Sequence, residues 1–154
     1  MILTIRPDSW NFPLLLHVGG AMLLVASITV AIVVFVQSWR ERDPDSSAKL
    51  FRFGARTMLF AALPAFLLMR IAAEWIVSRE NLSNSNATWI GIGFGTSDVS
   101  GLILLVTLIL TGIAGRRSRR GGELGKMAKI GGALPIVLLA LYLVAIWAMT
   151  TKPS

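Results

Sequence analysis

Four ionisable residues lie within long apolar stretches of the sequence, where a charged side chain is costly: His17, Arg70, Glu74 and Asp98. Glu74 follows Arg70 by four residues, the spacing at which side chains on one face of a helix meet. Together an imidazole, a guanidinium and two carboxylates can bind an anionic or quinone-like ligand, or pass protons. The alternative is structural, with the same groups forming an ion pair, a helix cap and a hydrogen bond between helices.

The elements that must position these residues are four apolar segments: 12–37, 57–77, 89–115 and 130–150. Each reaches the roughly 20 residues that an α-helix needs to cross a bilayer. At 1.5 Å per residue, His17 lies about 6 Å and Arg70 about 10 Å inside the ends of their segments. The sequence therefore predicts an all-α, four-helix transmembrane bundle, a single integral membrane domain over residues 1–154, with the ionisable residues at similar depth.

The net charge of +7 is distributed by side rather than evenly. Most lysines and arginines lie in the connections 38–56 and 116–129, and short loops of this kind stay in the cytoplasm. This predicts a plasma-membrane protein with both termini on the outer side. A basic patch in the second connection is expected to face anionic lipid: Arg116, Arg117, Arg119, Arg120 and Lys126. The lipid bilayer, and no nucleic acid, is therefore the expected partner.

Local signals predict where the first helices begin. Asn11 is expected to cap the first helix, with Pro13 in its first turn, where the missing N–H costs nothing. The run Asp43, Pro44, Asp45 predicts a stop and a new helix start, because acidic residues are favoured in a first turn.

Three further signals concern the second and third spans. Segment 46–56 is expected to be an amphipathic lead-in near the inner surface, with Gly54 as a break. Pro64 cannot donate to Phe60, which predicts a kink. Glycines alternate over 91–95 and leave two alternatives, an extended or re-entrant piece or a glycine-faced turn of the third helix.

Several kinds of chemistry are disfavoured by composition. The chain has no cysteine, which excludes disulfides and thiolate metal sites. Haem b ligated by two histidines is disfavoured because His17 is the single histidine, so haem would need a second copy of the chain or a methionine: Met22, Met69 or Met149. Copper held by His17 and methionine has no supporting ligand spacing, so the metal stays unknown. No G-x-S-x-G motif accompanies the histidine, and no residue is expected to be catalytic.

Residues 14–27, Leu-Leu-Leu-His-Val-Gly-Gly-Ala-Met-Leu-Leu-Val-Ala-Ser, resemble the first helix of small uncharacterised bacterial four-helix integral membrane proteins. These families are loosely similar to the copper-resistance D-like group. The resemblance implies a compact four-helix bundle in a bacterial plasma membrane, with His17 as the candidate functional position.

Two classes of function follow from these observations. The first is a non-enzymatic accessory subunit or homo-oligomeric assembly protein of a larger membrane complex, whose small-residue helix faces contact a partner. The second is a ligand-binding or redox protein, with haem or quinone, or a small proton-coupled transporter, that uses His17, Arg70, Glu74 and Asp98. The small and hydroxylated faces expected to pack belong to the first and third spans: Gly20, Ala21, Ser27, Ala31, Ser97, Ser100, Gly101, Leu104, Thr107 and Thr111.

Overall fold

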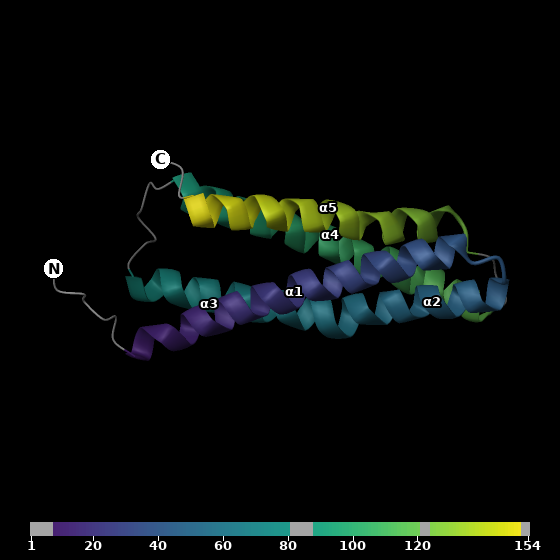
Figure 1. Cartoon of the computed structure of the whole chain (residues 1–154), viewed down its shortest axis with the longest axis horizontal. Coiled ribbons are helices and arrows are strands. Elements are labelled where there is room, and N and C mark those ends of the chain that lie inside the picture. The colour runs from purple at the N-terminus through teal and green to yellow at the C-terminus, as the bar shows by residue number, and fades with distance from the viewer. Residues whose placement is uncertain (1–7, 81–87, 121–123, 152–154) are drawn as a thin grey trace.

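The computed structural model describes residues 8–80, 88–120 and 124–151, and within these ranges all regular structure is helical. The elements in chain order are α1 (Asp8–Arg40), α2 (Pro44–Thr57), the π-helical turn η1 (Met58–Ala62), α3 (Leu63–Glu80), α4 (Thr88–Arg119) and α5 (Lys126–Thr151) (Figure 1). Within the described ranges, four helices are long and apolar enough to cross a membrane: Phe12–Arg40, Pro44–Arg79, Ile90–Arg119 and Lys126–Thr151. The predicted all-α architecture is confirmed, and the four long helices have the length and composition of membrane spans.

The helices form two antiparallel pairs (Figure 1). One pair is α1 with the continuous helix α2–η1–α3, and the other is α4 with α5. α1 also packs on α5, and α2 on α4, whereas α3 and α4 barely touch. We call the end with the α1–α2 turn and the α4–α5 connection the basic end, and the opposite end the terminal end. The two pairs are therefore held together mainly toward the basic end and diverge toward the terminal end.

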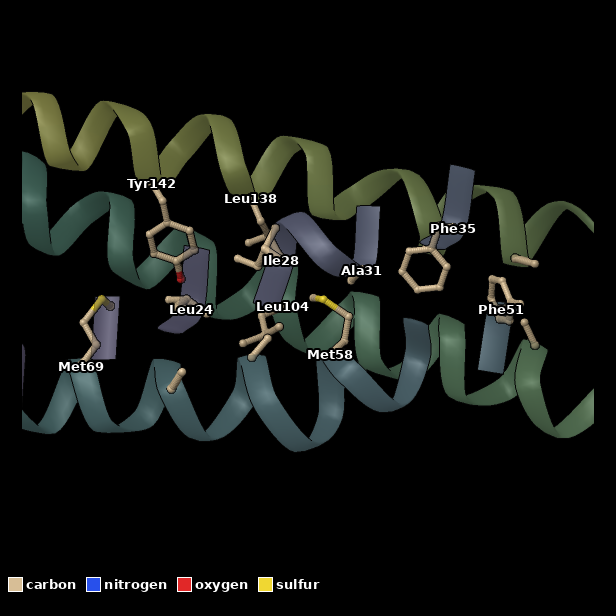
Figure 2. Close-up of a cluster of buried hydrophobic side chains, with 14 residues drawn as sticks. Leu24, Ile28, Ala31, Phe35, Phe51, Met58, Met69, Leu104, Leu138 and Tyr142 are labelled. Carbon is tan, nitrogen blue, oxygen red and sulfur yellow. The ribbon is translucent and has the colours of Figure 1, made fainter. Parts of the chain in front are cut away.

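The buried core runs along α1, the central helix of the bundle. Leu24, Ile28, Ala31 and Phe35 follow one another at intervals of three or four residues and are fully buried. They meet Met58 and Phe51 on one side and the α4–α5 pair on the other (Figure 2). The ring centroids of Phe35 and Phe51 are 5.2 Å apart, within the range of favourable aromatic pairs.

Glycines set the closest helix contacts. A Cβ atom at Gly20 would lie 2.9 Å from the backbone nitrogen of Met69, so α1 and α3 touch backbone to backbone. A Cβ atom at Gly54 would lie 2.8 Å from the Phe35 ring. The expected break at Gly54 is therefore wrong, because the helix continues through this residue and uses its missing side chain to seat the ring. Segment 46–56 is an amphipathic helix as predicted, and it packs along α1 and continues into η1 without interruption.

The predicted restart after the first span is confirmed. Asp43 is the N-cap of α2, its carboxylate accepts a hydrogen bond from the Ser46 backbone N–H at 2.9 Å, and Pro44 is in the first turn. Ser46, through its side chain and its backbone N–H, lowers the pKa of the Asp43 carboxyl. Ser38 and Ser47 fix the turn, because each hydroxyl donates to the other residue's carbonyl oxygen, at 2.9 and 2.7 Å.

The prolines modify helices without ending them. The expected start of α1 at Asn11 is wrong, because the helix begins at Asp8 and Pro13 lies buried inside it. Near Pro64 the structure has the π-helical turn η1, which includes Phe60. In a regular α-helix the ring of Pro64 would clash with the carbonyl group of Phe60, four residues earlier, and the wider π turn relieves that contact. The distortion expected from Pro64 is thus a π turn.

The glycine-rich stretch 91–95 is α-helical, which decides between the two alternatives that the sequence left open. Gly93 faces α5, and a Cβ atom there would lie 2.8 Å from the terminal methyl group of Met149. Close packing of α4 on α5 compensates for the poor helix propensity of glycine.

Candidate functional site

An apolar cleft opens between the two helix pairs at the terminal end. All four long helices line it, including His17 from α1, Met69 and Arg70 from α3, Phe94 and Ser97 from α4, and Tyr142 from α5. Its cavity volume is about 70 Å³, and the empty space including the open mouth is about 580 Å³. Ile146 and Met149, both exposed, form part of the lining. The cleft thus has a narrow interior, room for a few water molecules, behind a wider apolar mouth.

His17 connects α1 to α3 at this cleft. Its Nδ1–H donates to the Met69 backbone carbonyl oxygen at 3.0 Å. In the neutral imidazole this leaves Nε2 as an acceptor. The hydrogen bond fixes the orientation of the half-buried ring at the side of the cleft. It is the hydrogen bond between helices that the structural alternative predicted from the sequence.

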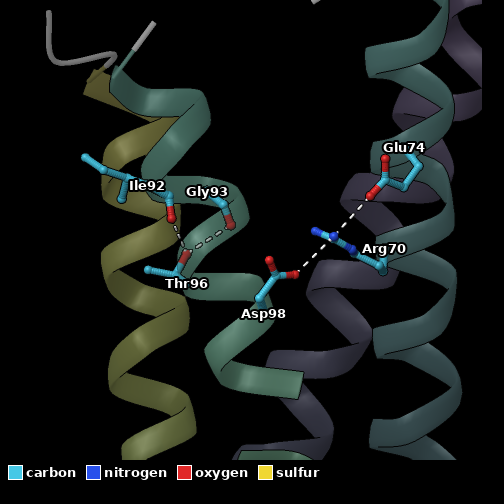
Figure 3. A network of polar contacts seen from close by, with 6 residues as sticks. All are labelled: Arg70, Glu74, Ile92, Gly93, Thr96 and Asp98. Atoms are coloured by element: carbon cyan, nitrogen blue, oxygen red, sulfur yellow. Dashed lines mark hydrogen bonds and ion pairs between the residues drawn. The ribbon is translucent and has the colours of Figure 1, made fainter. Parts of the chain in front are cut away.

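Arg70 is the centre of an ion-pair network between α3 and α4. Its Nη2 atom lies 3.0 Å from Glu74 Oε1 and 3.0 Å from Asp98 Oδ1 (Figure 3). The guanidinium carbon also lies 4.7 Å from the centroid of the Phe94 ring, a cation–π distance. Because α3 and α4 otherwise barely touch, this network is their main connection at the terminal end.

The network has more negative than positive charge. One guanidinium faces two carboxylates, both of them exposed. Of the four sequence-derived site residues, His17 and Arg70 line the cleft, whereas Glu74 and Asp98 flank Arg70 without lining it. An anionic ligand would have to compete with two carboxylates for the guanidinium, so the geometry favours a neutral ligand over an anionic one.

Three buried hydroxyl oxygens at or beside the cleft make no well-formed hydrogen bond within the described residues, and the last two of them face each other: Ser97 Oγ, Ser100 Oγ and Tyr142 Oη. The Ser100 residue is fully buried and Tyr142 is 5% exposed. Leaving a buried polar group unpaired costs about 1–3 kcal/mol. The threonines of α4 avoid that cost, because Thr96, Thr107 and Thr111 each donate to the carbonyl four residues earlier at 2.7 Å (Figure 3 shows Thr96).

Tyr142 is the site residue that sequence reasoning missed. It is the only tyrosine of the chain and lies in the middle of an apolar span. A buried tyrosine usually finds a hydrogen-bond partner, so this position carried a usable signal. The ring points from α5 into the bundle (Figure 2). Ser97 and Ser100 were assigned to a packing face, and the structure places Ser97 at the cleft as well.

The candidate metal and haem ligands are divided by the fold. Met69 and Met149 line the cleft with His17, whereas Met22 is 69% exposed on the outside of α1. Within the described ranges, His, Asp and Glu side chains form no group of three or more suited to a metal ion.

The predicted basic patch lies at the basic end and is divided between two clefts. Arg116 and Arg119 line one cleft together with Arg52 and Arg56 of α2. Arg117 and Lys126 line a different, smaller cleft beside the α4–α5 connection, and Arg120 lines neither of the two. The chain matches no protein-family model, no curated protein and no solved structure.

Proposed function

We propose that the chain is a non-enzymatic membrane protein that binds a neutral apolar ligand, with a hydrogen-bonding head such as that of a quinone, in the cleft at the terminal end. The observation that carries this proposal is a pair of buried hydroxyls in the cleft lining, those of Ser97 and Tyr142. Neither makes a well-formed hydrogen bond within the described residues, although Ser100 lies beside Tyr142. A carbonyl or hydroxyl head would satisfy them, and the exposed apolar residues at the mouth would contact its hydrocarbon part.

A bacterial plasma membrane, with both termini on the outer side, is the location that fits this ligand. The resemblance of residues 14–27 to bacterial four-helix proteins supports the membrane. The orientation is supported by the basic residues that α1, α2, α4 and the residues next to them place at one end: Arg40, Arg42, Lys49, Arg52, Arg56, Arg116, Arg117, Arg119 and Arg120. In this orientation the ligand cleft lies in the outer half of the bilayer.

In this account Arg70 is a positioning residue. Its guanidinium already has two carboxylates and the Phe94 ring as partners, so it has little capacity left for a ligand. By connecting α3 to α4 it fixes the width of the cleft. Glu74 and Asp98 would help to hold α3 and α4 at this distance. A proton-coupled transporter remains a prediction, and the ion pairing of both carboxylates with Arg70 does not favour it.

Replacing Tyr142 by phenylalanine tests the proposal in two ways. Without ligand, the variant should be more stable than the wild type by about 1 kcal/mol, because an unpaired buried hydroxyl is removed. Its affinity for the probe decylubiquinone should fall about five- to tenfold, because one hydrogen bond of about 1 kcal/mol is lost. Thermal unfolding in detergent and quenching of tryptophan fluorescence by the quinone measure the two quantities.

Thr107→Val is the matched control, since it removes a buried hydroxyl that is already bonded within α4. It should not gain stability and should bind decylubiquinone as the wild type does. Equal affinity of Tyr142→Phe and the wild type, or no binding to either, would refute the quinone-like ligand.

A second candidate is the accessory or assembly protein. Gly91 and Gly95 lie four residues apart on α4, and neither has an atom within 4 Å of the place a Cβ would occupy. Such an open G-x-x-x-G face allows a second helix to approach closely. By contrast, Gly20, Gly131 and Gly132 are already used in contacts within the chain, so these glycines are not available to a partner helix.

A further inference from the structure

A second cleft, at the basic end between α2 and α4, combines a large cavity with two arginines on each wall. Its cavity volume is about 620 Å³. Two arginines project from each wall, Arg52 and Arg56 from α2 and Arg116 and Arg119 from α4. The spacings of four and three residues place each pair on one helix face. No acidic residue lines this cleft.

The four guanidinium groups have no ion-pair partner among the described residues. Like charges at these spacings repel one another, so the arrangement costs free energy unless an anion neutralises it. Arginine binds phosphate through paired N–H groups, which makes a guanidinium pair on each wall suited to one phosphate each.

The floor of the cleft is apolar and continues away from the arginines along the helices. Leu59, Phe60 and Leu108 line it, and Phe60 is 72% exposed. Gly112 and Gly115 make the hollow, since a Cβ at Gly112 would have no atom within 4 Å and one at Gly115 would only reach the Arg52 side chain, at 3.9 Å. Such an apolar surface contributes nothing to the binding of a soluble anion, whereas it can contact the acyl chains of a lipid.

From this geometry we infer that the cleft between α2 and α4 is a binding site for an anionic phospholipid with two phosphates. One phosphate lies between Arg52 and Arg56 and the other between Arg116 and Arg119, with the acyl chains along Leu59 and Phe60. Basic pockets between membrane helices are suited to this lipid chemistry. The inference concerns residues other than those of the proposed ligand cleft and does not depend on that function.

The run of arginines at the end of α4 provides a matched pair of variants. Arg116→Gln/Arg119→Gln removes two charges from the cleft, and Arg117→Gln/Arg120→Gln removes two charges from the same run of arginines outside the cleft. Cardiolipin added to the purified protein in a neutral detergent is the probe, and native mass spectrometry measures its binding. The first variant should bind cardiolipin about thirtyfold more weakly, because each arginine contributes about 1 kcal/mol and about 1.4 kcal/mol corresponds to a factor of ten. The second variant should bind cardiolipin nearly as the wild type does.

Gly112→Leu tests the same site without changing the charge. A leucine there fills the hollow and favours the helix, so the protein should fold and cardiolipin binding should fall. If an arginine variant fails to fold, as judged by circular dichroism and gel filtration, this variant decides.

Four outcomes would overturn the inference. Equal losses in the two arginine variants would mean diffuse attraction to the basic end. Unchanged binding by Gly112→Leu would exclude the hollow. Phosphatidylglycerol binding as tightly as cardiolipin would exclude the two-phosphate assignment. Displacement of cardiolipin by inorganic phosphate would show that the arginines take the free anion rather than the lipid.

Discussion

Gly20→Leu should lower the free energy of unfolding by about 3 kcal/mol, at the upper end of the cost of overpacking a helix contact. The reason is that even a Cβ atom at this position would lie 2.9 Å from the Met69 backbone nitrogen and 3.2 Å from the Ala65 carbonyl oxygen. Backbone atoms cannot move aside as a flexible side chain can, so α1 and α3 must separate. The His17 bond to the Met69 carbonyl, next to this contact, should lengthen or break. Unfolding in mixed micelles of SDS and a mild detergent measures the change.

The neighbouring glycine provides the control. Gly19 has no atom within 4 Å of its Cβ position, so Gly19→Leu adds the same side chain to the same helix without a clash. Its stability should be unchanged or up to about 1 kcal/mol higher, because leucine favours a helix more than glycine does. Similar stabilities of the two variants would show that α1 and α3 do not make the backbone contact described above.

Arg70→Met should lower the free energy of unfolding by about 2 kcal/mol. Two charge-assisted contacts at 3.0 Å are lost, and two carboxylates lose their common counter-ion. The average polar contact in a membrane bundle contributes about 0.6 kcal/mol. The expected loss is larger because two ion pairs are broken at once, and exposure of both carboxylates keeps it from being larger still. The same unfolding measurement tests it.

A double-mutant cycle separates the two contacts of Arg70. Adding Asp98→Asn to Arg70→Met removes one uncompensated carboxylate and should recover about half of the loss. Arg70→Lys should be intermediate, since an ammonium group is a point charge without the planar fork that serves two carboxylates. Full stability of Arg70→Met would mean that the network does not connect α3 to α4.

The sequence was sufficient for several features that follow from helix geometry, although not for the start of α1. The spacing of Arg70 and Glu74 predicted their ion pair, and Asp43 with Pro44 predicted the start of α2. Depth in the span correctly brought Asp98 to the level of Arg70. Each of these depends on the rise and periodicity of a helix, which sequence position specifies.

Features that depend on two helices were not predictable in the same way. Glycine has the same low helix propensity at a helix break and at a close helix contact, so the local sequence does not distinguish the two. At Gly54 the Phe35 ring of the neighbouring helix does, because it packs against the glycine. The two basic connections were recognised separately, but only the packing of α2 on α4 brings Arg52 and Arg56 to Arg116 and Arg119. The position of Tyr142 in the middle of a span was a usable signal, but only the packing of α5 shows that its hydroxyl is buried without a well-formed hydrogen bond.

Native mass spectrometry of the wild-type chain, extracted from its own membrane in mild detergent, tests the central claim most directly. The account predicts chains that carry one neutral molecule of isoprenoid-quinone mass, distinguishable from bound phospholipid, and a smaller fraction of loaded chains for Tyr142→Phe. Bare chains, multiples of the chain, or the chain with another polypeptide and without such a molecule would contradict the ligand cleft and favour the assembly protein.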